Sequence, residues 1–141
     1  MSDKEKKLID EFHAVDPDTD ENEMFTRLGI LNIKEGNEFK KVGAGIIRIL
    51  ENKTNHRCRI VMRSNGDYTP LLNHWVFPSS TMKAQGEKVI QWTTKDWTNG
   101  KERTVTVGCA FMSKDAADDF VKVATQAKTK NAALLKDKNY R

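Results

Sequence analysis

The sequence contains no apolar run of about 18 residues, the shortest length typical of a membrane-spanning helix. Residues 1–12, MSDKEKKLIDEF, carry charges of both signs where a secretory signal requires an apolar core. Only two cysteines are present, Cys58 and Cys109, and both lie in segments of alternating apolar residues. That placement favours two buried thiols in a reducing compartment, with a single bridge as the alternative. We therefore expect a protein of the cytoplasm or nucleus that does not insert into membranes.

Patterns typical of catalysis and metal binding are also missing. The three histidines lack ligand spacing with one another and with the cysteines, so no metal site is expected. His56 and Cys58 fall on one strand face, but a separation of two residues does not give the hydrogen-bond geometry of a nucleophile and its base. Gly43 and Gly45 do not belong to a G-x-x-x-x-G-K-[ST] phosphate loop. We expect no enzyme, no catalytic residue and no cofactor.

The net charge is +4, from 24 basic and 20 acidic residues, but the distribution of these charges along the chain is more informative about binding partners. Residues 16–23, DPDTDENE, are acidic, whereas residues 57–63 and 128–141 are basic. Such polarity suits a partner that carries patches of both signs. The simpler alternative is that each run is a solvated surface.

From Met24 onward, short runs rich in Ile, Val, Thr and aromatic residues alternate with turn signals. In residues 55–63, NHRCRIVMR, the apolar side chains point to one face of a strand and Arg57, Arg59 and Arg63 to the other. Gly43 and Gly45 share a strand face, which permits a bend or the close approach of another backbone. The predicted strands are 24–33, 39–50, 55–63, 68–77, 82–84, 88–95 and 102–111.

One amphipathic helix follows the strands. Ser113 is a suitable N-cap, Asp115 complements the helix dipole, and apolar residues around Phe120 recur at spacings of three and four. Leu134 and Leu135 either extend this helix or lie in a frayed tail. The pattern predicts a mainly β fold, a seven-stranded sandwich or barrel capped by one helix, as in pleckstrin-homology-like domains.

Four segments, in order, carry a family resemblance. They are KEGNEFKKVGAGIIRIL from residue 34, RIVMR from residue 59, LLNHWVFP from residue 71 and VGCAFMSKDAADDFVKVATQAK from residue 107. Together, over residues 23–128, they resemble Ran-binding domains, most closely the stand-alone type. The chain departs from the family pattern at Phe39, where a tryptophan is usual, at Val42 and at Thr69. These departures bear on individual contacts rather than on the fold.

The resemblance implies a flexible acidic arm over residues 1–22, a Ran-binding domain over 23–130 and a basic tail over 131–141. The residues of the implied arm are Asp16, Asp18, Asp20 and Glu21. The implied Ran-binding residues are Glu23, Phe39, Lys40, Lys41, Arg48, Arg57, Arg59, Arg63, Asn73 and Trp75. In the family, the acidic arm wraps around Ran, and the domain receives Ran's acidic tail. Without the resemblance, a solvated strand face is the simpler interpretation of the arginines.

Membership would imply a monomeric, non-catalytic effector of GTP-bound Ran in nucleocytoplasmic transport. Such a domain acts in the cytoplasm or nucleus, including the nuclear pore. It helps to release Ran from transport receptors and helps the Ran GTPase-activating protein to stimulate hydrolysis, so both are expected in ternary complexes. The alternatives are a module of the same fold that binds a proline-rich peptide or a phosphoinositide, and a nucleic-acid binder. The acidic arm disfavours nucleic acid because it would repel phosphate.

Overall fold

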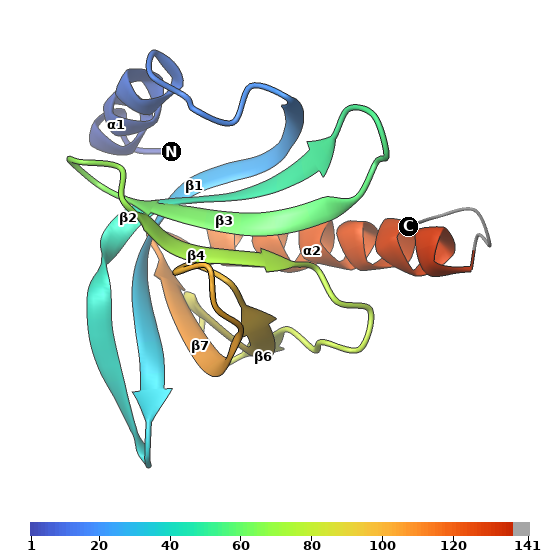
Figure 1. Ribbon diagram of the computed structural model, residues 1–141. Coiled ribbons are helices and arrows are strands. Elements are labelled where there is room, and N and C mark those ends of the chain that lie inside the picture. Colours follow the sequence, from blue (N-terminus) through green and yellow to red (C-terminus); the bar gives the residue numbers. More distant parts are fainter. Residues whose placement is uncertain (137–141) are drawn as a thin grey trace.

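The computed structural model describes residues 1–136 and shows seven antiparallel strands and two helices in that range (Figure 1). In chain order the elements are α1 (Asp3–His13), β1 (Glu21–Glu35), β2 (Glu38–Asn52), β3 (Cys58–Ser64), β4 (Pro70–Trp75), β5 (Lys83–Ala84), β6 (Val89–Asp96), β7 (Arg103–Phe111) and α2 (Lys114–Leu135). Each predicted strand is present with ends that differ by only a few residues, because period-two alternation marks a strand with one buried face. The mainly β fold with a C-terminal helix is confirmed.

The strands form one curled sheet in the order β4-β3-β2-β1-β7-β6-β5. The two sides of the sheet meet where β4 approaches the loop that follows β6. There the Asn73 N–H donates to the Asp96 carboxylate over 2.8 Å, and the Trp97 N–H donates to the Asn73 carbonyl over 2.9 Å. These bonds satisfy backbone groups that an open sheet edge would leave to solvent. The sheet therefore closes toward a barrel.

Gly45 permits the close approach of β2 and β3. A Cβ atom at this position would lie 2.1 Å from the carbonyl oxygen of Arg63, closer than any side chain allows. The predicted role for glycine here is confirmed. The close approach also fixes the relative positions of the side chains on the outer faces of the neighbouring strands β2 and β3.

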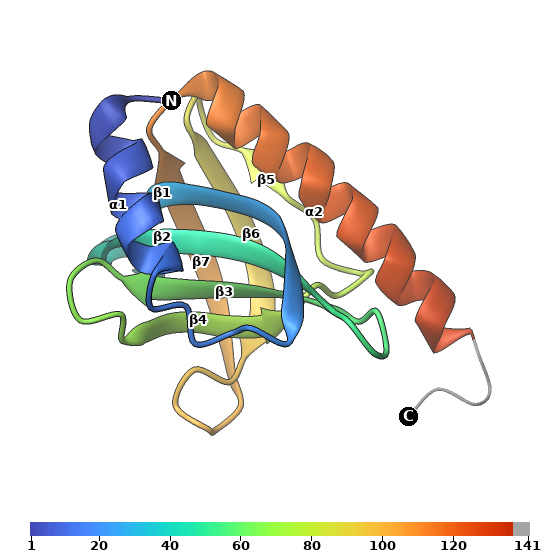
Figure 2. The same cartoon turned by 90° about the horizontal axis from the view of Figure 1, so that it is seen from above.

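Helix α2 closes the barrel core (Figure 2). Its N-cap is Ser113, whose hydroxyl accepts the Ala116 N–H over 3.1 Å, as predicted. The Phe120 ring packs against Phe25, Trp92 and Phe111 at centroid distances of 5.4, 5.2 and 5.1 Å. Aromatic pairs at these distances add to the hydrophobic burial that holds the helix on the sheet.

The C-terminal turns of α2 belong to the folded domain. Asn131 is buried, and its side-chain amide donates to the carbonyls of Cys58 and Val76 over 2.9 Å each and accepts the Cys58 N–H over 2.8 Å. A tail beginning at residue 131 is therefore wrong for residues 131–135, and Leu134 and Leu135 extend the helix. Residues 137–141 of the predicted tail lie outside the described range.

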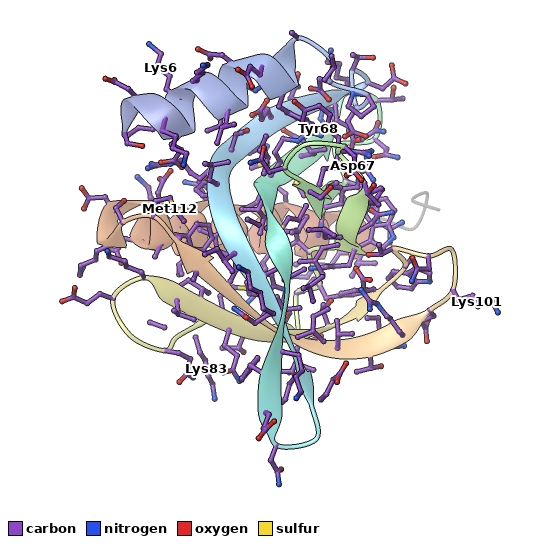
Figure 3. All side chains as sticks on the ribbon, turned by 90° about the vertical axis from the view of Figure 1, so that its left-hand side faces the viewer. Lys6, Asp67, Tyr68, Lys83, Lys101 and Met112 are labelled. Atoms are coloured by element: carbon purple, nitrogen blue, oxygen red, sulfur yellow. The ribbon has the colours of Figure 1, made fainter. Side chains whose placement is uncertain are left out.

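The N-terminal segment is also not a flexible arm throughout. Ser2 caps α1, and the helix buries Ile9 and Phe12 against the outside of the sheet, away from α2 (Figure 2). The Phe12 ring packs 5.2 Å from the ring of Tyr68, which lies in the hairpin beside α1 (Figure 3). The buried carboxylate of Glu5 accepts hydrogen bonds from Arg27 and from the Leu28 N–H. A polar helix is ordered here because the sheet supplies its apolar and charged partners.

Replacing Asn131 tests whether the end of α2 is structural. Asn131→Ala leaves two buried carbonyls and one buried N–H without their partner, so the free energy of unfolding should fall by about 2–4 kcal/mol. Urea unfolding followed by circular dichroism measures the change. The control is Gln126→Ala on the exposed side of α2, which should change stability by no more than about 0.5 kcal/mol. Equal stabilities of the two variants would contradict the structural role.

Candidate interaction site

Three arginines lie together on the outer face of β2 and β3. Arg48 of β2 is paired with Val61 of β3, and Arg59 and Arg63 flank Val61 two residues away on either side. Direct partners and residues two apart in a strand share a face, so the three guanidinium groups converge. Three like charges this close require compensating anions.

The compensating anions come from the segment between α1 and β1. The Asp18 carboxylate accepts hydrogen bonds from Arg48, from Arg59 over 3.2 Å and from Arg63 over 3.2 Å. The Asp16 carboxylate accepts from Arg48 over 3.0 Å, and that of Glu21 accepts from Arg59 over 2.6 and 2.8 Å. We call these six side chains the acid–arginine cluster. Its three carboxylates balance its three arginines.

Asp18 is the centre of the acid–arginine cluster. Its side chain is 8% exposed, and that of Arg48 is 1% exposed. Burial alone would raise the pKa of Asp18, but the hydrogen bond from Arg63 and the charges of Arg48, Arg63 and Arg59 outweigh burial and hold this pKa below its ordinary value. The Arg48 guanidinium also lies 4.5 Å from the centroid of the Phe12 ring, which joins the cluster to α1.

These contacts change the predicted picture of an arm reaching away from the domain. Asp16, Asp18 and Glu21 are bound to arginines of the same chain, and those arginines are occupied rather than open to a partner's carboxylates. Glu23 contacts His13 over 2.8 Å, and Asp20 is exposed. The sequence shows acidic and basic runs but not that they face each other. That pairing depends on the path between α1 and β1.

A second group of predicted residues meets where β3 begins and β4 ends. The Arg57 guanidinium lies 3.6 Å from the centroid of the Trp75 ring, and Arg59 donates to the Asn73 side-chain oxygen over 2.9 Å. A pocket of about 360 Å³ opens beside them. Its lining residues are Glu21, Asn52, Arg59, Asn73, His74, Trp75 and Trp97. We call Arg57, Asn73, Trp75 and this pocket the β3–β4 patch; sequence reasoning assigned no role to Asn52 or Trp97.

Buried polar groups position the β3–β4 patch from beneath. Burial lowers the pKa of His74, so its ring is neutral. It accepts the Trp92 indole N–H over 3.2 Å and donates to the Trp75 carbonyl over 2.8 Å. Asp96 accepts the backbone N–H of Asn73. These bonds hold the backbone that presents Asn73 and Trp75.

The third group, Phe39, Lys40 and Lys41, lies on the β1–β2 hairpin, which points away from α1 (Figures 1 and 3). Phe39 is 42% exposed, and its ring covers Gly108, where a Cβ atom would meet it at 3.4 Å. Lys40 contacts Glu38 over 3.2 Å at the surface. The structure therefore separates this hairpin surface from the two groups on β3 and β4.

Cross-strand pairing extends the hairpin surface beyond the predicted residues. Consecutive partners run Lys41, Asn32, Gly108, Gln91 and Lys83 across β2, β1, β7, β6 and β5. Because partners share a face, the row places an amide on each side of Gly108 and a lysine at each end. No local motif marks Gln91 or Lys83. Only the register of the sheet brings Gln91 beside Phe39 and places Lys83 next to Gln91.

Neither cysteine is an activated nucleophile. Burial raises the pKa of Cys58 to about 11 and that of Cys109 to about 12, so both thiols stay protonated at neutral pH. Among residues 1–136, no three His, Cys, Asp or Glu side chains gather in a way that could hold a metal ion. Neither helix in this range is long and apolar enough to cross a membrane.

Comparison with known proteins identifies the family. The RanBP1 domain matches residues 17–130. The chain belongs to the RanBP1 domain family. Its match begins at Pro17, so the segment bearing Asp18 and all strands of the barrel are included. Helix α1 precedes the matched range.

Three curated relatives are much longer proteins than this chain. The chain is 34% identical over 98 residues to E3 SUMO-protein ligase RanBP2 of Pan troglodytes and of Homo sapiens, which covers 68% of this chain and 3% of each relative. RanBP2-like and GRIP domain-containing protein 4 of Homo sapiens is 33% identical over 98 residues, covering 68% of this chain and 6% of that protein. The chain thus spans a small fraction of these curated relatives.

Solved structures share the fold. The Ran-binding domain of Nup2 from Ashbya gossypii has a TM-score of 0.67 at 24% identity, covering 79% of this chain and 98% of that chain. The Dm DCP1 EVH1 domain, solved in complex with the XRN1 DBM peptide, has a TM-score of 0.65 at 14% identity, covering 92% of this chain and 93% of that chain. The predicted pleckstrin-homology-like fold of this RanBP1 domain is confirmed.

The acid–arginine cluster should make stability depend on pH through Asp18. At pH 7, Asp18→Asn should lower the free energy of unfolding by about 3 kcal/mol, because three clustered arginines lose a buried carboxylate. The pKa of Asp18 is lower in the folded than in the unfolded chain. Its contribution is therefore complete above the ordinary carboxyl pKa of about 4 and is lost as pH falls through the folded-state pKa.

Urea unfolding of wild type and Asp18→Asn across this pH range checks that dependence. The difference in free energy should narrow as the solution becomes more acidic. Asp20→Asn removes an exposed carboxylate from the same segment and should cost no more than about 0.5 kcal/mol at any pH. A constant penalty for Asp18→Asn at every pH would show that its charge is not what stabilises the domain.

Proposed function

We propose that this RanBP1 domain binds GTP-bound Ran as a non-catalytic effector in nucleocytoplasmic transport. Family membership supports the partner, and the stack of the half-buried Arg57 and Trp75 side chains is the single observation that carries the site. The ring holds the guanidinium plane in a fixed orientation 3.6 Å away. Arginine and tryptophan dominate the energetics of protein interfaces, and a pre-oriented pair loses little freedom on binding.

The hairpin surface supplies a second contact to the same partner. Phe39 offers an exposed ring, and Lys40 and Lys41 extend from the same strand. The β3–β4 patch and the hairpin lie on different parts of the barrel (Figure 1). A partner that reaches both must wrap around the domain, which suits a globular protein with an extended tail.

Preference for the GTP form requires differential affinity, since a ligand shifts a conformational equilibrium only by the difference between its affinities for the two states. In our proposal the domain holds a segment of Ran that the GTP form presents. Through this binding the domain helps to release Ran from transport receptors and helps the GTPase-activating protein of Ran to stimulate hydrolysis. In our proposal the protein acts in the cytoplasm or nucleus and at the nuclear pore. One solved domain of the same fold comes from NUP2, a nuclear pore complex component.

The hairpin surface favours a second candidate, the binding of an extended peptide. The EVH1 domain that shares this fold was solved with a peptide. Here Phe39, Val89 and Gly108 form an apolar floor flanked by the amides of Asn32 and Gln91. Side-chain amides can donate to and accept from a peptide backbone without regard to its sequence. Nucleic acid and phosphoinositides are less suited, because carboxylates neutralise the arginine face.

Titration with purified Ran tests the proposal. The chain should bind Ran loaded with a non-hydrolysable GTP analogue far more tightly than Ran loaded with GDP. Arg57→Glu and Trp75→Ala should each weaken binding about 30-fold, equivalent to about 2 kcal/mol at an interface hot spot. Lys122→Glu makes the same charge reversal on the exposed side of α2 and should leave affinity within about twofold.

Isothermal titration calorimetry gives both affinities, and circular dichroism verifies that each variant is folded. Equal affinity for the two nucleotide forms, or no binding to either, would reject the Ran proposal. Retained Ran binding by both patch variants would reject the β3–β4 patch as its site.

A further inference from the structure

Residues 16–20 are attached to the barrel by their charges. Their sequence, DPDTD, contains no large apolar side chain, and they lie between α1 and β1 in no helix or strand. Besides the carboxylate contacts, the Lys53 ammonium donates to the Thr19 carbonyl over 3.1 Å, and the Lys53 backbone N–H donates to the Asp20 carbonyl over 3.3 Å. The segment thus occupies the arginines as a bound acidic peptide would.

The acid–arginine cluster has an inner and an outer part. Arg48 and Asp18 are 1% and 8% exposed, whereas Asp16, Arg59 and Arg63 are 20%, 22% and 17% exposed. Arg59 also lines the open pocket of the β3–β4 patch. A carboxylate arriving from solvent can therefore meet Arg59 before Asp18 has left it.

Both ends of the segment are anchored independently of its carboxylates. On one side α1 is held by buried Phe12 and by the Glu5–Arg27 ion pair, with N···O of 2.9 Å. On the other, Glu21 begins β1 and is paired with Asn52 of β2. Residues 14–20 can move off the arginines while α1 and the barrel stay in place.

We propose that the arginine cluster is an exchange site: it holds Asp16 and Asp18 in the free protein and receives in their place an acidic segment of a partner. The incoming segment carries two carboxylates two residues apart, as the segment it replaces does. Glu21, fixed in β1, remains on Arg59. Exchange keeps three arginines matched by three carboxylates, whereas addition without displacement would leave excess buried negative charge.

This inference deepens the proposed function, since it rests on a partner with an acidic tail, and it assigns a regulatory role to the arm. A tethered segment competes at high effective concentration, so it lowers the apparent affinity of the partner's tail.

The first test uses a fluorescein-labelled hexaglutamate peptide and fluorescence anisotropy with the full chain at low salt. The double variant Asp16→Asn with Asp18→Asn empties the site of its internal ligand and should bind the peptide at least about fivefold more tightly than wild type. Asp10→Asn with Glu11→Gln removes two exposed carboxylates from α1 and is the charge-matched control. It should stay within about twofold of wild type.

Unchanged or weakened binding by the folded double variant would overturn the exchange. An equal gain in the α1 control would do so too, because that result indicates general electrostatic attraction alone.

A second test needs no substitution and so remains decisive if the double variant fails to fold. In wild type the Asp18 N–H donates to the Asp16 carboxylate over 2.8 Å. Adding excess hexaglutamate should shift the backbone amide resonance of Asp18 and accelerate its hydrogen exchange, while the amide of buried Phe12 keeps its protection. Peptide binding that leaves the Asp18 amide unchanged would overturn the exchange.

Repeating the affinity measurement with Ran bound to a GTP analogue separates the two proposals. Tighter binding of both hexaglutamate and Ran by the double variant supports exchange and the Ran function together. A gain for hexaglutamate with no Ran binding by any variant rejects the Ran function and leaves exchange in place. Ran binding by wild type with no gain for either ligand rejects exchange and leaves the Ran function in place.

Discussion

Asp18 is the constraint on which the outer surface of this domain depends. Strand pairing brings Arg48, Arg59 and Arg63 to one face, and their mutual repulsion is relieved by a carboxylate that contacts all three. Because Asp18 comes from outside the barrel, neutralising the arginines also fixes the path between α1 and β1. That one ionic centre links the N-terminal helix to the strands.

The same constraint distinguishes the arginines that pair with carboxylates of this chain from the predicted binding residues that lie outside the acid–arginine cluster. Arg48 is buried under Phe12 and two aspartates, so a partner's carboxylate reaches it only after those aspartates have left. Arg57 stacks on Trp75, and the hairpin surface around Phe39 lies at the other end of the first two strands. The barrel fixes where these groups lie relative to one another. The close approach at Gly45 aligns β2 with β3, and the hydrogen bonds of Asn131 hold α2 at the start of β3.

Local pattern predicted the barrel because its strands alternate apolar and polar residues and α2 begins at a recognisable cap, Ser113. It did not predict α1, whose few apolar side chains become a buried face only when Arg48 and Tyr68 supply the opposite surface. The C-terminal end of α2 is a similar case. Asn131 appears polar in sequence, yet its partners are backbone groups of Cys58 and Val76, far away along the chain.

For the site, alternation predicted that Arg59 and Arg63 share a face, but Arg48 joins them only through the register of β2 on β3. The acidic run was visible as well, and its resemblance to a partner-binding arm suggested that it points outward. Which arginine receives which carboxylate depends on side chains 30 to 45 residues apart. No local rule contains that information, just as none joins Gln91 to Phe39.

The most direct test is the distance between the arm and the barrel with and without the partner. Spin labels at Thr19→Cys and Asn65→Cys report it by double electron–electron resonance, since Cys58 and Cys109 are buried and resist labelling. The exchange mechanism predicts one short, narrow distance distribution in the free protein and a longer, broader one when Ran with a GTP analogue is bound. An unchanged distribution in the Ran complex would contradict the displacement of the acidic segment.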